Sequence, residues 1–424
     1  MTNHLEAVQR RTLRLLFVVQ IVSGVGIAIG SSVGALLVAE LAGVGASGLA
    51  QSAAVVGAAL LAVPATAIVH RRGRRPSLAA AYLVAAVGSI AVVVAAVRDS
   101  IPLIFVGFFL FGGATAASLQ ARYAAVDLAP AALRGRHLSV IVWATTLGAV
   151  AGPNLAAVAG ASLDRYGIPT LAGPFVFSSL LLGLAAAALV LLMRPDPAIL
   201  ARGAAAPSTE SAPRPKGTGM NAALRAVASN PPARLGVAAM AVGHMVMVGV
   251  MAMTPVHIRD AGHDAAHTLR IVGVVLSVHI AGMYAFAPVI GWLTDRFGRR
   301  PVILAGVLFL VAACALAGRA EHDPVRLAIG LMALGIGWSS TMVAGSTLLS
   351  ESVSAELRTS AQGLSDVTMG LAGASAGALS GVVVQAWGFP ILALIAALAT
   401  APLVLLATQR IREEAAAKRM PRIG

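Results

Sequence analysis

The sequence predicts an all-α membrane protein with twelve transmembrane helices arranged in two six-helix halves. Three observations support this: an apolar composition, a series of apolar segments long enough to cross a bilayer, and loop motifs that recur in both parts of the chain. The 424 residues are 58% hydrophobic and 11% charged, with a mean hydropathy of +0.86. Soluble domains do not have this composition.

Twelve apolar segments follow one another along the chain. We place them near residues 15–40, 48–69, 77–97, 102–126, 137–160, 171–193, 234–256, 268–294, 302–318, 326–349, 360–385 and 389–408. Each has about the length of a tilted helix that crosses the ~30 Å hydrocarbon core of a bilayer. The first segment is longer than the apolar region of a signal peptide, so we expect no cleavable signal. A single cysteine, Cys314, excludes an intramolecular disulfide.

The formal charge of +14 is distributed by side of the membrane. The loops expected inside contain Arg71, Arg72, Arg74, Arg75, Arg134, Arg136 and Arg194, and the loops expected outside contain few basic residues, such as Arg98 and Arg165. Basic residues also precede the first segment and end the chain. Cytoplasmic loops are rich in Lys and Arg, so the charge indicates topology rather than nucleic-acid binding. We expect a multi-pass protein of a bacterial inner membrane, with both termini cytoplasmic.

The chain divides into two similar halves, at 1–195 and 233–424, joined by a cytoplasmic linker at 196–232 that is rich in Pro, Ser, Gly and Ala. Three loop motifs recur: Gly73–Pro76 as Gly298–Pro301, Ala132–Arg134 as Glu356–Arg358, and Tyr166–Pro169 as Trp387–Pro390. Parallel repeats of this kind are typical of transporters that bind their substrate between the halves, near the middle of the membrane.

Methionine and histidine are concentrated in the seventh and eighth segments. Helical spacing places His244, Met247 and Met251 on one stripe, and His279 and Met283 on another. Thioethers and imidazoles without carboxylates suit soft monovalent copper better than magnesium or calcium. The alternative is packing, because methionine fills apolar cores well. The two histidines favour a metal site over packing, since an ionisable side chain within a membrane is costly and usually marks a functional site.

The outer loop between these segments adds three histidines, His257, His263 and His267, together with Asp260 and Asp264. His263 and His267 would share a helix face and could capture metal for the methionines. A solvated polar loop is the alternative. Two nearby arginines, Arg259 and Arg270, oppose the attraction of a cation.

The whole chain resembles the major facilitator superfamily. The loop signature G-x-x-x-D-R-x-G-R-R of that family is matched in full by Gly291, Asp295, Arg296, Gly298, Arg299 and Arg300. The first-half copy has Thr66 and His70 where the glycine and the aspartate belong. We therefore expect the cytoplasmic contacts of this loop to be weaker. We expect the loop arginines to pair with Asp127 in the first half and Glu351 in the second, and to gate the transporter. For Asp366, inside the eleventh segment, we favour a structural role near Asp295 over proton coupling.

A narrower resemblance concerns the substrate. The pairs Met247-x-x-x-Met251 and His279-x-x-x-Met283 resemble the signatures of the CcoA-like bacterial copper importers, in which these residue types bind copper. This resemblance implies a copper site, with copper as the transported substrate and no cofactor. A related member of that branch transports riboflavin, so a flavin or a drug is the alternative substrate, and Trp143, Tyr284 and Trp338 could stack on it.

Three further expectations concern enzymatic activity, partners and the direction of transport. The chain contains no metalloprotease motif, nucleophile elbow or phosphate loop, so we expect no enzymatic activity. We expect a monomer whose partners are the lipid bilayer and a copper ion or small molecule. We predict import of copper, driven by the membrane potential, with His279 bound in its neutral form.

Overall fold

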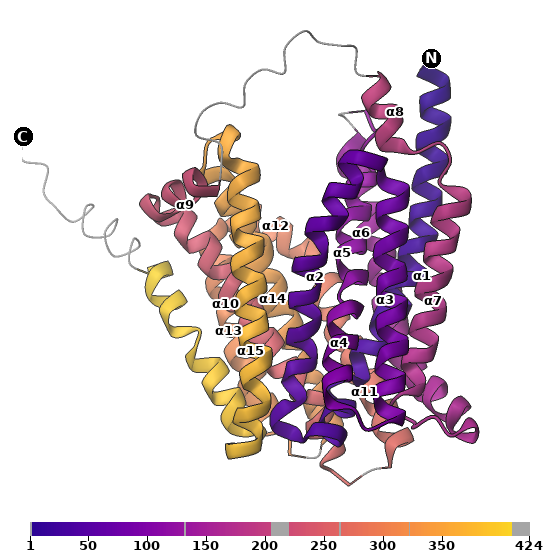
Figure 1. Ribbon diagram of the computed structural model, residues 1–424. Helices are drawn as coiled ribbons and strands as arrows, with labels where there is room; N and C mark the ends of the chain where they lie inside the picture. Colours follow the sequence, from indigo (N-terminus) through magenta and orange to yellow (C-terminus); the bar gives the residue numbers. More distant parts are fainter. Residues whose placement is uncertain (1, 131–132, 205–219, 263, 322, 409–424) are drawn as a thin grey trace, which may run out of the picture. The chain divides into compact units, whose positions relative to one another are not determined.

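The computed structural model describes residues 2–130, 133–204, 220–262, 264–321 and 323–408 (Figure 1). Regular structure in these residues is helical throughout, and no strand occurs among them. The predicted all-α membrane fold is therefore confirmed. His263 and the basic tail after residue 408 lie outside the described residues.

The first part of the chain forms eight of the labelled helices. Their bounds are Thr2–Ala42 (α1), Val44–Arg72 (α2), Arg74–Val97 (α3), Ile101–Phe111 (α4), Gly113–Ala124 (α5), Arg134–Leu163 (α6), Gly173–Leu192 (α7) and Pro197–Ala204 (α8). Helices α4 and α5 together form the fourth predicted span, which is interrupted at Gly112. Helix α1 packs against α6 and α7, and α3 packs against α4 and α7.

The second part forms seven more. Their bounds are Met220–Ser229 (α9), Pro231–Arg259 (α10), Ala265–Tyr284 (α11), Ala287–Phe297 (α12), Arg299–Gly318 (α13), Pro324–Ser352 (α14) and Ala355–Leu398 (α15). Helices α11 and α12 form the eighth predicted span, and α13 packs against α14 and α15. The segment expected as a linker contains α8 and α9, so it is partly helical.

Eleven helical stretches in the described chain are long and apolar enough to cross a membrane. The last stretch, Ser360–Thr408, has 49 residues and would be ~74 Å long at ~1.5 Å per residue, more than twice the thickness of the hydrocarbon core. Within it Gly388 has φ 80° and ψ 169°, a conformation that breaks the helix and that glycine adopts readily. The stretch therefore contains the last two of the predicted spans.

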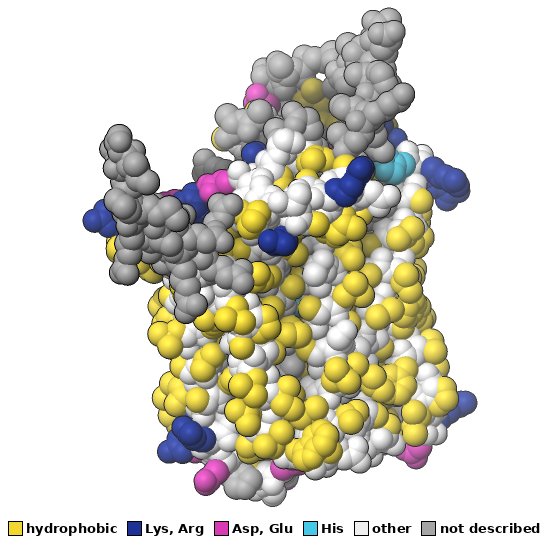
Figure 2. Space-filling model, turned by 90° about the vertical axis from the view of Figure 1, so that its left-hand side faces the viewer, with side chains coloured by type: hydrophobic (Ala, Val, Ile, Leu, Met, Phe, Trp, Pro, Cys, Tyr) yellow, Lys and Arg dark blue, Asp and Glu magenta, His cyan; other side chains and the backbone are white. Residues whose placement is uncertain are grey.

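Apolar side chains also cover the surface where lipid is expected. Figure 2 shows one face on which hydrophobic side chains fill the middle, while Lys, Arg, Asp and Glu lie at the two ends. On α15 the exposed side chains include Leu371, Leu379 and Val382. An exposed apolar surface this large would be a liability in water and is the normal surface of a protein in a bilayer.

The helices cluster into two compact units. The first contains the described residues up to 204 together with Ala252–Ser277, and the second contains 220–251 and those from 278 to 408. The C-terminal end of α10 and the first part of α11 therefore cluster with the first unit, although the sequence assigns them to the second half. Whether 1–195 and 233–424 are separate domains joined by 196–232 stays a prediction.

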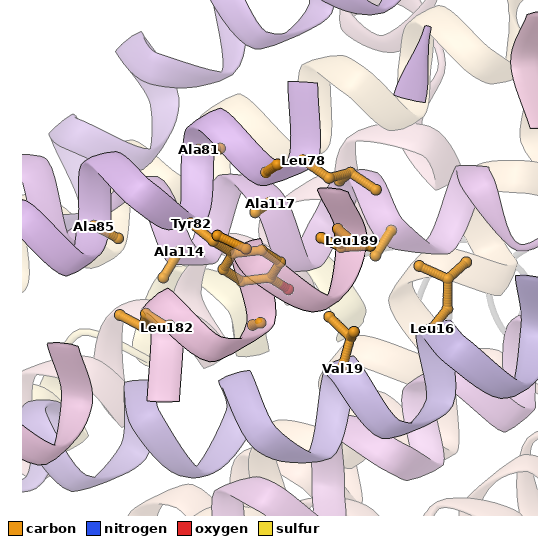
Figure 3. Close-up of a cluster of buried hydrophobic side chains, with 14 of the residues drawn as sticks. Leu16, Val19, Leu78, Ala81, Tyr82, Ala85, Ala114, Ala117, Leu182 and Leu189 are labelled. Carbon is orange, nitrogen blue, oxygen red and sulfur yellow. The ribbon is translucent and has the colours of Figure 1, made fainter. Parts of the chain in front are cut away.

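A closely packed cluster of Leu, Ala, Val and aromatic side chains forms the core of the first unit (Figure 3). Tyr82 of α3 lies fully buried in it, and its hydroxyl accepts from Ser23 Oγ (3.0 Å) and donates to Gln20 Oε1 (2.9 Å). Gln20 Nε2 in turn donates to Ser118 Oγ and Thr145 Oγ1, both at 3.0 Å. Buried polar groups need hydrogen-bond partners, and here the partners lie on neighbouring helices, so these bonds join α1, α3, α5 and α6.

Two apolar clusters of described residues lie in the core of the second unit. One joins α10, α12, α13 and α14 and includes Leu235, Ile303 and Val307; the other packs α9 against α10, α14 and α15 through Ala223 and Val227. Helix α9 is therefore held by its apolar side, so the end of the expected linker is part of this unit.

Candidate functional site

The four residues of the predicted copper set lie in the second unit, two on α10 and two on α11. Met247, His279 and Met283 are buried, and Met251 is half-buried. No hydrogen bond in the described part of the chain joins any two of them. Their role as one metal site stays a prediction.

His279 lies at a close contact between α11 and α14. Its ring nitrogen Nδ1 lies 2.8 Å from the carbonyl oxygen of Leu331. A carbonyl can only accept, so Nδ1 donates and the neutral ring has a bare Nε2. That Nε2 is buried and has no hydrogen-bond partner among the described residues. Gly335 permits the contact, because a Cβ there would overlap the backbone of His279.

His244 on α10 has the opposite arrangement. Trp338 Nε1 on α14 donates to its Nδ1 over 3.2 Å. An indole N–H can only donate, so Nδ1 is the bare nitrogen and the hydrogen of the neutral ring lies on Nε2. The edge of the ring that contains Nε2 faces Gly373 of α15, where a Cβ would lie 2.9 Å from Nε2. His244 is therefore held between α14 and α15.

Trp338 also contacts Tyr284, and together with His244 these residues form what we call the aromatic cluster. The ring centroids of Tyr284 and Trp338 lie 6.1 Å apart at 71°, an edge-to-face contact, and those of His244 and Trp338 lie 6.4 Å apart. The three side chains are half-buried, so each has surface that a ligand can contact. Tyr284 and Trp338 were among the aromatic residues expected to stack on an organic substrate, but their contacts with each other and with His244 were not predicted. Trp143 is 61% exposed on α6, in the first unit.

In the loop expected outside, the structure describes His267 and Asp264 of the predicted capture site. His267 lies in the first turn of α11, where its backbone N–H donates to Asp264 Oδ1 over 2.8 Å, and this bond holds the pKa of Asp264 below its usual value. Asp260 lies 3.7 Å from Arg259. The described residues contain no group of three or more His, Cys, Asp or Glu that could hold a metal. With His263 outside the described residues, metal capture here stays a prediction.

The loops expected inside form matching ion pairs in the two units. Arg74 Nε and Nη2 donate to the two carboxylate oxygens of Asp127, at 2.9 and 3.2 Å. Arg299 Nε and Nη2 donate to those of Glu351, at 2.9 and 2.6 Å. Arg74 and Arg299 occupy the same position of the repeated motif and both make two-pronged contacts, which fix the orientation of the side chains.

The other residues predicted to gate also lie in the second unit. Asp295 Oδ1, near the end of α12, lies 3.7 Å from Arg299 Nη2 at the start of α13. The guanidinium of Arg296 lies 6.0 Å from the ring centroid of Phe297, and Arg300 is half-buried in the first turn of α13. Asp366 is exposed on α15. Their part in gating stays a prediction.

Sequence reasoning missed a contact between the linker and the inner loop of the first unit. Asp196 Oδ2 accepts from the backbone N–H of Arg75 over 2.7 Å, and its Oδ1 accepts from those of Ala198 and Ile199 at 3.0 and 3.3 Å. The carboxylate thus caps α3 and α8 together. Gly73 is needed, because it has φ 95° and a Cβ there would lie 2.5 Å from Asp196 Oδ2. The clue in the sequence was an Asp preceding a short helix.

Comparison with known proteins identifies the family. The family model described as the Major Facilitator Superfamily matches residues 16–269 and 263–422. The chain is 37% identical over 392 residues to the "Uncharacterized MFS-type transporter YdeG" of Bacillus subtilis, covering 92% of this chain and 89% of that protein. It is 27% identical over 350 residues to the "Riboflavin transporter RfnT" of Brucella anthropi, covering 80% and 82%.

A solved structure has the same fold. The nucleoside transporter NupG superposes with a TM-score of 0.73 at 15% identity, covering 96% of this chain and 98% of that one. At this identity the likeness concerns the fold. None of these matches supports the narrower resemblance to copper importers.

Proposed function

The chain belongs to the major facilitator superfamily and is a multi-pass membrane transporter of the secondary type, and we propose that its substrate is a small planar organic molecule. The observation that carries the proposal is the aromatic cluster of His244, Tyr284 and Trp338 in the second unit. Aromatic side chains offer large surfaces for a planar ring, with edge-to-face or stacked contacts worth about 0.5–1.5 kcal/mol beyond area burial. The histidine adds a polar group of defined direction.

The cluster has the general character of a binding site for small molecules. Such sites are mostly apolar and contain a few polar groups that orient the ligand. All three rings are half-buried, so each keeps surface that a ligand can contact. The rings of a core cluster would be fully buried. The similarity to the riboflavin transporter of Brucella anthropi agrees with a planar heteroaromatic substrate, so riboflavin is the first molecule to test.

Copper is the second candidate, and one observation favours it. His279 donates Nδ1–H to a backbone carbonyl and leaves Nε2 bare and buried. Histidines that bind metals usually donate their other ring N–H to a carbonyl or carboxylate in this way, which fixes the tautomer and the ring orientation. With Met283 one turn further on α11 and Met247 buried on α10, His279 would bind soft copper as the transported substrate.

Uptake by cells that express the chain separates the two candidates. Riboflavin and copper accumulation are measured side by side for wild type, Trp338→Ala and His279→Ala. If the substrate is planar and organic, Trp338→Ala lowers riboflavin uptake by about tenfold or more, the loss of one or two good contacts, and His279→Ala has a smaller effect. If the substrate is copper, His279→Ala lowers copper uptake and the wild type accumulates no riboflavin.

Two matched controls accompany the variants. Trp143→Ala removes an exposed tryptophan of the first unit, and Met369→Ala removes a half-buried methionine that belongs to neither candidate set. Both should transport as wild type. Wild-type riboflavin uptake in Trp338→Ala, with the variant present in the membrane at the normal amount, would refute the organic substrate at this site.

Direction and coupling follow from the charge of the substrate. Inward movement of a monovalent cation is favoured by ~2.3 kcal/mol per 100 mV of potential, negative inside. For copper we therefore propose import driven by the potential. A neutral organic substrate gains nothing from the potential alone and needs its own concentration gradient or a coupled ion. Uptake into vesicles with an imposed potential distinguishes the two cases.

A further inference from the structure

We propose that His244 is a hydrogen-bond donor to the substrate and not a metal ligand, because Trp338 fixes its tautomer. The inference deepens the proposed function, since it names the chemistry that the substrate must have. Indole Nε1–H has no lone pair to offer, so its 3.2 Å contact to Nδ1 requires a bare Nδ1. The neutral imidazole then has its only hydrogen on Nε2.

A metal would have to break this arrangement. An imidazole ligates through a nitrogen lone pair, and in His244 the lone pair on Nδ1 already accepts from Trp338. Ligation through Nε2 would require its hydrogen to move to Nδ1, where it would face the indole N–H. Two donors would then point at each other, and the Trp338 bond would be lost. His279 differs, because its bare nitrogen has no partner among the described residues.

The position of the ring leaves the Nε2–H usable. His244 is half-buried, and Trp338 donates to its Nδ1. The Nε2 edge faces Gly373, the residue whose missing side chain leaves room for the ring. The ring of His244 also contacts that of Trp338, so a ligand that packs on the aromatic cluster can accept from this N–H.

The matching substrate has two features. It has a planar ring that fits against the indole and the phenol, and it has a hydrogen-bond acceptor at its edge, such as a ring carbonyl or a pyridine-type nitrogen. An edge that presents only N–H groups would meet the His244 N–H as donor against donor and would be rejected, because a buried unpaired donor is costly.

Nitrogen NMR of the full-length chain, purified in detergent with ¹⁵N-labelled histidine, tests the tautomer directly. Bare and protonated ring nitrogens have separate chemical shifts, and the two histidines are assigned with His244→Gln and His279→Gln. We expect a bare Nδ1 and a protonated Nε2 in His244, and the reverse in His279. Trp338→Phe keeps a ring but removes the N–H, and the other tautomer of His244 should then appear. Trp292→Phe, on α12, is the control and should leave His244 unchanged.

Ligand titrations on the same samples test the role. Riboflavin should move the Nε2 signal of His244, and His244→Ala should weaken riboflavin binding by about tenfold, as expected for one hydrogen bond. Monovalent copper should leave His244 unaltered. A protonated Nδ1 in the wild type, or loss of the Nε2 hydrogen on adding copper, would overturn the inference. If riboflavin does not bind at all, the proposed flavin-like substrate is wrong, while the tautomer and the copper titration still decide the inference.

Discussion

Replacement of Asp196 by alanine should release the start of α8 from the inner loop of the first unit. The carboxylate accepts three backbone N–H groups, from Arg75 in the first turn of α3 and from Ala198 and Ile199 in the first turn of α8. These amides precede the first intrahelical hydrogen bonds, so no backbone carbonyl of their own helix replaces the lost acceptor. A helix cap contributes typically ~1 kcal/mol and a hydrogen bond to a charged group ~1.5–3 kcal/mol. Because Asp196 is half-buried, we take a total of about 2 kcal/mol.

Hydrogen exchange measured by mass spectrometry or NMR reports this local stability. A loss of about 2 kcal/mol corresponds to roughly 30-fold faster exchange of the Arg75 amide. The matched control is Asp323→Ala, because Asp323 Oδ1 caps α14 in the same way, accepting from Val325 and Arg326. The control should speed exchange at the start of α14 only. Unchanged exchange at Arg75 in Asp196→Ala would refute the capping argument.

Three further predictions concern the loops and the aromatic cluster. Breaking the Arg299–Glu351 pair with Glu351→Gln should cost about 1 kcal/mol of stability at this half-exposed site and should alter the transport rate. The exchanged pair, Arg299→Glu with Glu351→Arg, should recover part of the wild-type rate. Equal rates in all forms would show that the pair does not gate. In Gly373→Ala the new Cβ would lie 2.7 Å from His244 Cδ2, so riboflavin uptake should fall about tenfold with normal membrane insertion, and wild-type uptake would contradict the described position of the ring. The lowered pKa of Asp264 means that its cap on α11 contributes stability at neutral pH. As the pH falls, that contribution should begin to decrease near the unfolded-state pKa of Asp264 and disappear below its folded-state pKa, so hydrogen exchange at the first turn of α11 should become faster. Exchange in Asp264→Asn should show no such pH dependence.

Much of the fold could be predicted because the bilayer imposes a length on each helix. Apolar runs located the spans, and the motif repeat located the break at Gly388, where continuous helix would otherwise suggest one long element. The partners of Arg74 and Arg299 were also predictable, because the arginines and the acids both lie at helix ends expected on the same side of the membrane, where few other charges compete.

Contacts between distant helices could not be predicted in this way. Periodicity gives the face of a helix on which a residue lies, but it gives neither the neighbour of that face nor its depth relative to the neighbour. His244 and Trp338 are 94 residues apart, and only the packing of α10 against α14 brings them together. The same stripe that suggested a copper ligand therefore also contains the partner of a tryptophan. Asp196 lies 121 residues from Arg75, in a segment expected to be a linker.

The measurement that tests the central claim most directly is counterflow of riboflavin in liposomes containing the purified chain. Vesicles loaded with unlabelled riboflavin are diluted into a trace of labelled riboflavin, and exchange requires neither a coupled ion nor a potential. We predict transient accumulation of label by the wild type and by Trp143→Ala, and a strongly reduced signal in Trp338→Ala. Absence of counterflow in wild-type liposomes that still accumulate copper would contradict a planar organic substrate and leave His279 as the centre of the transport site.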